Sequence, residues 1–128
     1  PFVAEKAMSD AWEEELRKMK TGGINIVATY LFWIHHEEKE NEWNFSGRRD
    51  IRRFVQLCRK VGLQVFLRIG PWVHAEVRNG GFPDWVQRAK DYEPRTNDEG
   101  YLKAVEKYFN QLGKQLEGRS GYRCSAGK

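Results

Sequence analysis

The chain has 128 residues, of which 40% are hydrophobic and 31% are charged, and this balance is typical of a globular domain. No apolar run approaches the roughly 18–20 residues that a membrane-spanning helix needs, so we expect no membrane partner. The formal net charge is +4, but residues 119–128 hold three basic residues and no acidic one, which leaves +1 for residues 1–118. The nearly neutral charge of residues 1–118 argues against a nucleic-acid-binding function.

The first elements predicted along the chain are a helix over residues 10–21 and a buried strand over residues 24–30. Apolar residues recur at helical spacing in the first segment, namely Trp12, Leu16 and Met19. Ser9 suits the N-cap position, and Gly22 and Gly23 end the helix. The β-branched run that follows predicts the strand.

A second helix is predicted over residues 48–61, with Ser46 as its N-cap, and a second strand over residues 63–69. One face of this helix is apolar and is formed by Ile51, Phe54, Val55, Cys58 and Val61. Cys58 therefore has the position of a buried, inert thiol, and two cysteines do not make a disulfide framework. A strand, a crossover helix and a strand form a βαβ unit whose strands run parallel.

The third helix follows a long loop, residues 70–95, and opens at a capping-box pattern, Thr96-x-x-Glu99. Its predicted apolar face is formed by Leu102, Val105, Phe109, Leu112 and Leu116. The alternation of helices and strands gives an α/β fold, either an open doubly wound sheet or a piece of a closed β/α barrel. Because two strands alone leave long unpaired edges, and because the chain starts at Pro1, we expect an excerpt of a larger domain.

The candidate functional residues collect in the two loops that follow the strands, residues 31–45 and 70–95. Such loops carry the ligand site in parallel α/β folds. They contain or adjoin four of the five tryptophans and all three histidines, together with several carboxylates. This mixture suits a sugar, which offers an apolar ring face and pairs of hydroxyls. Trp33, Trp72 and Trp85 are either aromatic platforms for a sugar or packing residues between barrel and loop.

Two groups of polar residues in these loops have alternative interpretations. His35, His36 and His74 raise the question of a metal site, but adjacent residues on an extended segment point in opposite directions, so we predict no metal. We expect His36 and Glu37 to hydrogen-bond at the mouth of the loops, and His35 to face outward or to pack. Glu76 is a candidate ligand-binding carboxylate, and its alternative role is to cap a neighbouring backbone.

Seven motifs, in chain order, carry a resemblance to a known family: Trp12-x3-Leu16-x2-Met19-Lys20-x-Gly22-Gly23-Ile24-Asn25, Thr29-Tyr30-x-Phe32-Trp33-x2-His36-Glu37, Phe45-Ser46-Gly47-x-Arg49-Asp50, Leu67-Arg68-Ile69-Gly70-Pro71, Ala75-Glu76, Gly80-Gly81-x-Pro83-x-Trp85 and Arg95-Thr96-Asn97-Asp98. Over about residues 10–117 the chain resembles glycoside hydrolase family 35, the β-galactosidase family. The resemblance implies a partial (β/α)₈ TIM barrel, from about the first helix to the third and incomplete at both ends. Residues 1–118 would belong to the catalytic barrel.

The resemblance also implies an activity and a site. The family hydrolyses terminal β-linked galactose with retention of configuration, using two glutamates that we expect beyond residue 118, so this chain would hold no catalytic residue. The partner would be a β-galactoside or a related oligosaccharide, with no cofactor and no metal. The substrate-binding positions are Tyr30, His74, Ala75 and Glu76. The pocket-shaping positions are Trp33, His36, Glu37 and Arg78.

Some residues depart from the family pattern. Val77 stands where the family commonly has a tryptophan and Arg78 where it has a small amide, which favours a substituted or acidic neighbouring sugar. Residues 119–128 are polar, basic and unlike the family's apolar fourth strand, which indicates a frameshift or a genuine flexible tail. Another TIM-barrel O-glycosyl hydrolase specificity and a non-catalytic carbohydrate-binding fragment remain as alternatives. The sequence does not identify the compartment, and the family resemblance is compatible with a secreted, periplasmic or lysosome-like one.

Overall fold

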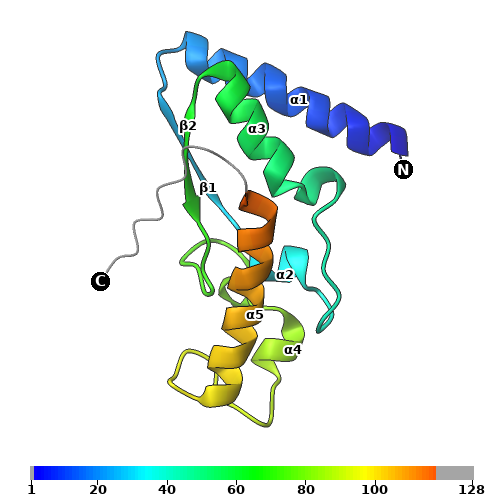
Figure 1. Cartoon of the computed structure of the whole chain (residues 1–128), viewed down its shortest axis with the longest axis vertical. Helices are drawn as coiled ribbons and strands as arrows, with labels where there is room; N and C mark the ends of the chain where they lie inside the picture. Colours follow the sequence, from blue (N-terminus) through cyan, green and yellow to red (C-terminus); the bar gives the residue numbers. More distant parts are fainter. Residues whose placement is uncertain (1, 118–128) are drawn as a thin grey trace.

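The computed structural model describes residues 2–117, with side chains described from residue 11 onward. The helices and strands are, in chain order, α1 (Phe2–Thr21), β1 (Ile26–Tyr30), α2 (Trp33–His36), α3 (Ile51–Val61), β2 (Gln64–Arg68), α4 (Asp84–Gln87) and α5 (Glu99–Leu116). Two 3₁₀ turns, η1 (Gly47–Arg49) and η2 (Arg78–Gly81), lie in the loops after the strands. The long helices α1 and α3 lie on one side of the two strands, and α5 extends past the strand ends (Figure 1).

The two strands pair in parallel, as predicted, so that β1, α3 and β2 form a βαβ unit. Their register runs from Ile26 opposite Gln64 to Tyr30 opposite Arg68. The Leu31 amide donates to the Arg68 carbonyl oxygen at 2.9 Å and extends the pairing by one step. Both strands therefore end at the same edge of the sheet, where Tyr30 and Arg68 are neighbours.

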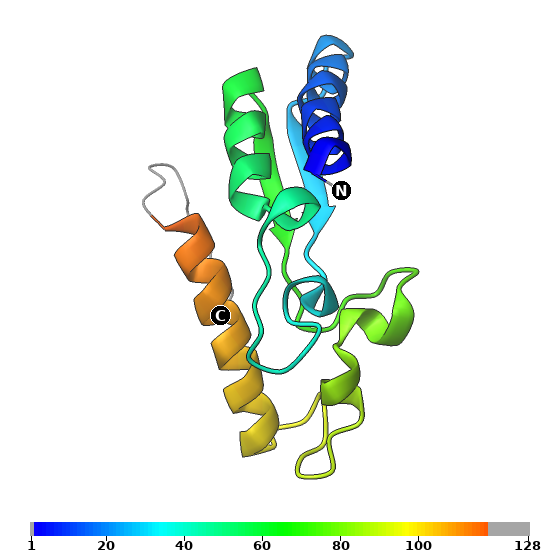
Figure 2. The same ribbon diagram turned by 90° about the vertical axis from the view of Figure 1, so that its right-hand side faces the viewer.

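The two faces of the sheet differ in burial. Val27 and Val65 face the helices and pack, partly buried, against the hydrophobic core there. Figure 2 shows α1 and α3 side by side in front of this face. On the opposite face, Ile26 is 56% exposed and Phe66 is 61% exposed. The prediction of buried strands is wrong for this second face, because the described residues supply no layer to cover it.

The smaller of two hydrophobic cores joins α1 to α3 and is formed by Leu16, Leu57, Cys58 and Leu63. Cys58 is fully buried, and desolvation raises the pKa of its thiol to about 11. The group therefore stays protonated at neutral pH. This confirms the prediction of a buried cysteine without thiolate character.

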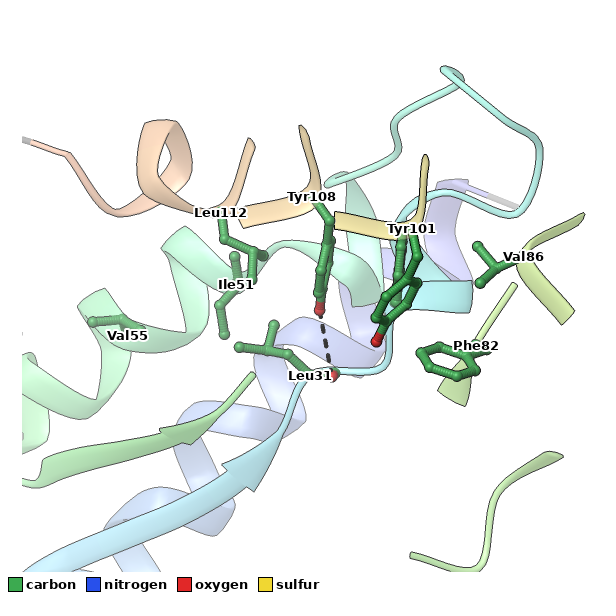
Figure 3. Packing of buried hydrophobic residues seen from close by; sticks show 9 residues of the cluster. Leu31, Ile51, Val55, Phe82, Val86, Tyr101, Tyr108 and Leu112 are labelled. Carbon is green, nitrogen blue, oxygen red and sulfur yellow. Dashed lines mark hydrogen bonds between the residues drawn. The ribbon is translucent and has the colours of Figure 1, made fainter. Parts of the chain in front are cut away.

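The larger core lies between α5 and the loops that follow the strands (Figure 3). From α5, Tyr108 and Leu112 point toward Leu31, which follows β1, and Ile51, which begins α3. The Tyr108 hydroxyl donates to the Leu31 carbonyl oxygen at 3.5 Å. This contact joins α5 to the carboxyl end of β1 and so supports the edge of the sheet from which both loops emerge.

The predicted apolar face of α5 is only partly correct. Leu112 is buried as expected, but Leu102 is 48% exposed, and the other buried side chains of the helix are Tyr101 and Tyr108. The spacing of Tyr101, Tyr108 and Leu112 follows one helical face, and both tyrosines bury a large ring on it. On α1, Met19 also lies outside the core, at 38% exposed.

Helix starts differ from the predicted ones. Helix α1 extends past Ser9 toward the N-terminus, so Ser9 is not its N-cap. Helix α3 is capped by Asp50, whose carboxylate accepts from the Arg53 amide at 2.9 Å, whereas Ser46 precedes the turn η1. A one-turn 3₁₀ segment between the predicted cap and the helix moves the true start by several residues.

The start of α5 is not a capping box. Asp98 is the N-cap, and its carboxylate accepts from the Gly100 amide at 3.0 Å. Thr96 lies further from the helix, where its hydroxyl oxygen accepts from the Asp98 amide at 3.1 Å. Asp and Thr both suit such positions, and here the aspartate is adjacent to the first helical turn.

The segment 119–128, with Cys124 and the frameshift hypothesis, lies outside the described residues. Between residues 2 and 117, none of the helices combines the length and the apolar character that crossing a membrane requires.

Candidate functional site

Tyr30 and Arg68 form a pair at the carboxyl edge of the sheet. Arg68 Nη1 donates to the Tyr30 hydroxyl oxygen at 2.6 Å, and the guanidinium carbon lies 4.6 Å from the centre of the tyrosine ring. The Phe32 ring stacks on Tyr30 at 5.9 Å with an interplanar angle of 13°. A cation and a second ring therefore hold this tyrosine in place.

A hollow of about 320 Å³ opens beside this pair, and Tyr30, Arg68, Trp72 and His74 are among the residues that line it. The pair comes from the ends of β1 and β2, whereas Trp72 and His74 come from the loop after β2. The hollow thus brings together aromatic rings, an imidazole and a phenol at the edge where parallel α/β folds carry their ligand sites.

Contacts on several sides hold the Trp72 indole. The Arg95 guanidinium carbon lies 4.2 Å from the indole centre, and the His74 ring stacks on it at 5.9 Å with an interplanar angle of 20°. Gly80 has a φ of +62°, and a Cβ atom at this position would overlap the indole ring. The backbone closes the loop where the Val73 amide donates to the Gly80 carbonyl oxygen at 2.8 Å. Only glycine allows this close approach to Trp72.

The other predicted substrate-binding residues lie on the same loop but do not line the hollow. Ala75 is half-buried and Glu76 is exposed. The Arg78 side chain is also exposed, and its guanidinium forms an ion pair with the Asp84 carboxylate at 3.4 Å. The structure therefore brings Tyr30 and His74 together and leaves Glu76 and Arg78 apart from them.

A buried network around Glu37 joins the two loops. The Glu37 carboxylate accepts from Trp33 Nε1 at 2.9 Å and from the Asn41 amide at 2.8 Å. Its backbone carbonyl oxygen accepts from Trp85 Nε1, in the second loop, at 3.0 Å. Burial raises the pKa of the Glu37 carboxyl, and the two hydrogen bonds to the carboxylate oppose that shift.

Trp33 is a packing residue and not a platform for a ligand. It is fully buried, and its ring stacks on Tyr108 at 5.0 Å with an interplanar angle of 7°. Phe82 and Trp85 contact it edge-on at 6.0 Å and 5.8 Å. No face of the indole is free for a sugar, so the packing interpretation holds for this tryptophan.

The two neighbouring histidines occupy different environments. His36 is buried, its Nδ1 donates to the Asn44 carbonyl oxygen at 3.0 Å, and its ring stacks on Phe45 at 4.6 Å. His35 is exposed and contacts the Phe32 ring edge-on at 5.2 Å. The two imidazoles lie apart, as predicted. The prediction assumed an extended segment, and this was wrong, because these residues form the helical turn α2.

The His36 environment predicts a pH dependence of stability. Burial lowers the pKa of His36 below its ordinary value, so the unfolded chain binds more protons than the folded chain just below that value. We expect stability to fall as the pH decreases from about 7.5 to about 5.5. In His36→Gln, which keeps an N–H donor for Asn44 but does not titrate, this fall should be smaller. Thermal unfolding at each pH measures the difference, and equal slopes for the two proteins would contradict it.

Three residues of the site had no separate predicted role, namely Arg68, Arg95 and Tyr108. Arg68 lies in one of the motifs and aligns with Tyr30 once the strands are paired, and this signal was sufficient to identify it. Arg95 also lies in one of the motifs, but no strand register aligns it with Trp72, and their contact depends on the path of the loop.

The family model "Glycosyl hydrolases family 35" matches residues 4–127. A β-galactosidase of Bos taurus is 42% identical over 101 residues, which are 79% of this chain and 16% of that protein. Beta-galactosidase 8 of Arabidopsis thaliana is 38% identical over 107 residues, or 84% of this chain and 13% of that protein. The chain thus spans about a sixth or less of these relatives.

The fold is also found in a solved structure. The crystal structure of a GH5_18 from Bifidobacterium longum subsp. infantis superposes with a TM-score of 0.69 over 89% of this chain and 26% of that one, at 16% identity. At this identity the match shows the fold alone, and it confirms the expected part of a (β/α)₈ barrel. By its family match and its relatives, the chain belongs to glycosyl hydrolase family 35.

Proposed function

We propose that this chain forms one wall of the substrate pocket of a retaining β-galactosidase that removes terminal β-linked galactose. The observation that carries the proposal is the hollow at the carboxyl edge of β1 and β2, lined by Tyr30, Trp72 and His74, in a chain of this family. Aromatic rings and hydrogen-bonding polar groups are suited to the apolar face and the hydroxyls of a sugar.

In this proposal the residues of the chain bind and orient the sugar. The Tyr30 hydroxyl and the His74 imidazole are hydrogen-bonding groups at the hollow, and Ala75 and Glu76 complete the subsite when the substrate is present. Trp33, His36 and Glu37 shape the pocket from below by holding the first loop in place. Arg78 does not line the hollow, and its guanidinium pairs with the Asp84 carboxylate. We therefore propose no preference for an acidic sugar.

The reaction itself requires two carboxyl groups roughly 5–5.5 Å apart, one as nucleophile and one as acid/base. Glu37 is the buried carboxylate of the described residues, but both of its oxygens already accept hydrogen bonds from Trp33 and Asn41. This supports the proposal that the catalytic pair lies outside residues 1–118 and that the chain alone is inactive.

An activity measurement tests the proposal. The pure 128-residue chain should release no nitrophenol from an aryl β-galactoside, whereas the full-length gene product should release it and should form the β-anomer of galactose first. Proton NMR of the nascent sugar distinguishes the anomers. Hydrolysis by the isolated chain, or initial formation of the α-anomer, would contradict the proposal.

The same experiment separates the alternatives. If the full-length gene product prefers another aryl β-glycoside, the chain belongs to a glycosidase of different specificity. If it binds galactose saturably but hydrolyses none of these substrates, the pocket has only a binding function.

A further inference from the structure

Arg68 is a cation at the candidate site without an acidic partner. It is exposed at the end of β2, and no carboxylate of the described residues lies within ion-pair distance of it. Its side-chain partner is the Tyr30 hydroxyl, 2.6 Å from Nη1. Because the guanidinium donates to a phenol and not to a carboxylate, we look for the role of Arg68 in its effect on Tyr30.

The direction of the hydrogen bond determines what Tyr30 offers to a ligand. A guanidinium has only donors, so the Tyr30 oxygen is the acceptor in this pair. The hydroxyl hydrogen is not used in this bond, and no residue in the described part of the chain accepts it. Tyr30 is therefore left as a hydrogen-bond donor toward the hollow that it lines.

The position of the Tyr30 ring also depends on Arg68. The guanidinium lies 4.6 Å from the ring centre, and the Arg68 carbonyl oxygen accepts from the amide that follows Tyr30 at 2.9 Å. The strand register aligns the two residues, so the side chain and the backbone of Arg68 act on the same tyrosine. A phenol with a fixed ring and a fixed acceptor bond presents its proton in one direction.

We infer that Arg68 is a positioning residue, which holds the Tyr30 hydroxyl as a donor to a neutral oxygen of the bound sugar. The inference rests on the proposed function. A sugar hydroxyl or ring oxygen is an acceptor that this donor fits.

A double-mutant cycle in the full-length gene product tests the inference. Arg68→Met and Tyr30→Phe should each lower kcat/KM for an aryl β-galactoside by about 10- to 100-fold, as expected for loss of a hydrogen bond in a charge-assisted pair. The double variant should be no worse than the more severe single variant, because both changes remove the same contact to the sugar. Arg68→Lys, which keeps a charged donor, should recover part of the activity.

Arg59→Met is the matched control. Arg59 is an exposed arginine in the last turn of α3, at the opposite end of the unit from Tyr30, and its replacement should leave kcat/KM unchanged. Thermal unfolding followed by circular dichroism checks that each variant is folded, and Arg68→Lys replaces Arg68→Met in the cycle if the latter does not fold. Additive losses in the cycle, or wild-type activity of Arg68→Met, would overturn the inference.

A crystal structure of the same Arg68 variant separates failure of this inference from failure of the proposed function. If the wild-type protein hydrolyses no β-galactoside, the proposed function fails, but the Tyr30 ring should still leave its position when Arg68 is replaced. A ring that stays in place in the variant overturns the positioning role whatever the activity.

Discussion

Trp33→Ala is expected to lower the free energy of unfolding of the barrel by about 3–5 kcal/mol, the usual range for removing a large buried aromatic side chain. Trp33 is fully buried between Tyr108 of α5 and Phe82 and Trp85 of the second loop. Its removal leaves a cavity where these segments meet and takes one hydrogen-bond donor from the buried Glu37 carboxylate. Thermal unfolding of the full-length gene product, followed by circular dichroism, measures the effect.

Trp33→Phe separates the two contributions. The phenyl ring keeps most of the stacking on Tyr108 but lacks the Nε1 donor, so the cost should fall to about 1–3 kcal/mol, the range for an unsatisfied buried polar group. If Trp33→Ala and Trp33→Phe have equal stability, packing of the aromatic ring does not contribute to the free energy of unfolding as described.

Gly80→Ala adds a single methyl group, but we expect it to disturb the site strongly. The residue has a φ of +62°, and the added methyl group would overlap the Trp72 indole, so the ring has to leave its place against Arg95. We expect a loss of about 1–3 kcal/mol in stability. We also expect kcat/KM of the full-length gene product to fall by about 10-fold or more, because Trp72 lines the hollow.

Gly113→Ala is the matched control for that change. Gly113 lies inside α5, and a Cβ atom there would have no neighbour within 4 Å. Because alanine is the better helix former, this variant should be more stable by about 0.5–1 kcal/mol, with unchanged activity. If Gly80→Ala and Gly113→Ala had the same stability and the same kcat/KM, the contact between Gly80 and Trp72 would be unimportant.

The elements that periodicity predicts best are the long ones. The helices α3 and α5 are found close to their predicted places, because their apolar residues recur over several turns. The two short strands are also found close to their predicted places, the first of them predicted from its β-branched run. The short turns α2, α4, η1 and η2 lie in segments expected to be loops. A single helical turn contains too few residues for a period to be recognised, and tertiary contacts decide its conformation.

The interior of the site could be predicted only in part. Tyr30 and His74 follow from the family resemblance, and the hollow does bring them together. The role of Trp33 depends on whether its ring faces solvent or α5, and residues near position 33 carry no information about Tyr108, which is distant in the chain. The pairing of Arg68 with Tyr30 needs the strand register, since the two are 38 positions apart.

The bond from Trp85 Nε1 to the Glu37 carbonyl oxygen has a consequence for protein engineering. It links a loop that follows β1 to a loop that follows β2, and the same glutamate also fixes Trp33. Segments joined in this way form one cooperative unit and do not behave as independent inserts. Transfer of either loop alone between family members should give poorly folded hybrids, whereas transfer of residues 31–45 and 70–95 together should preserve the pocket.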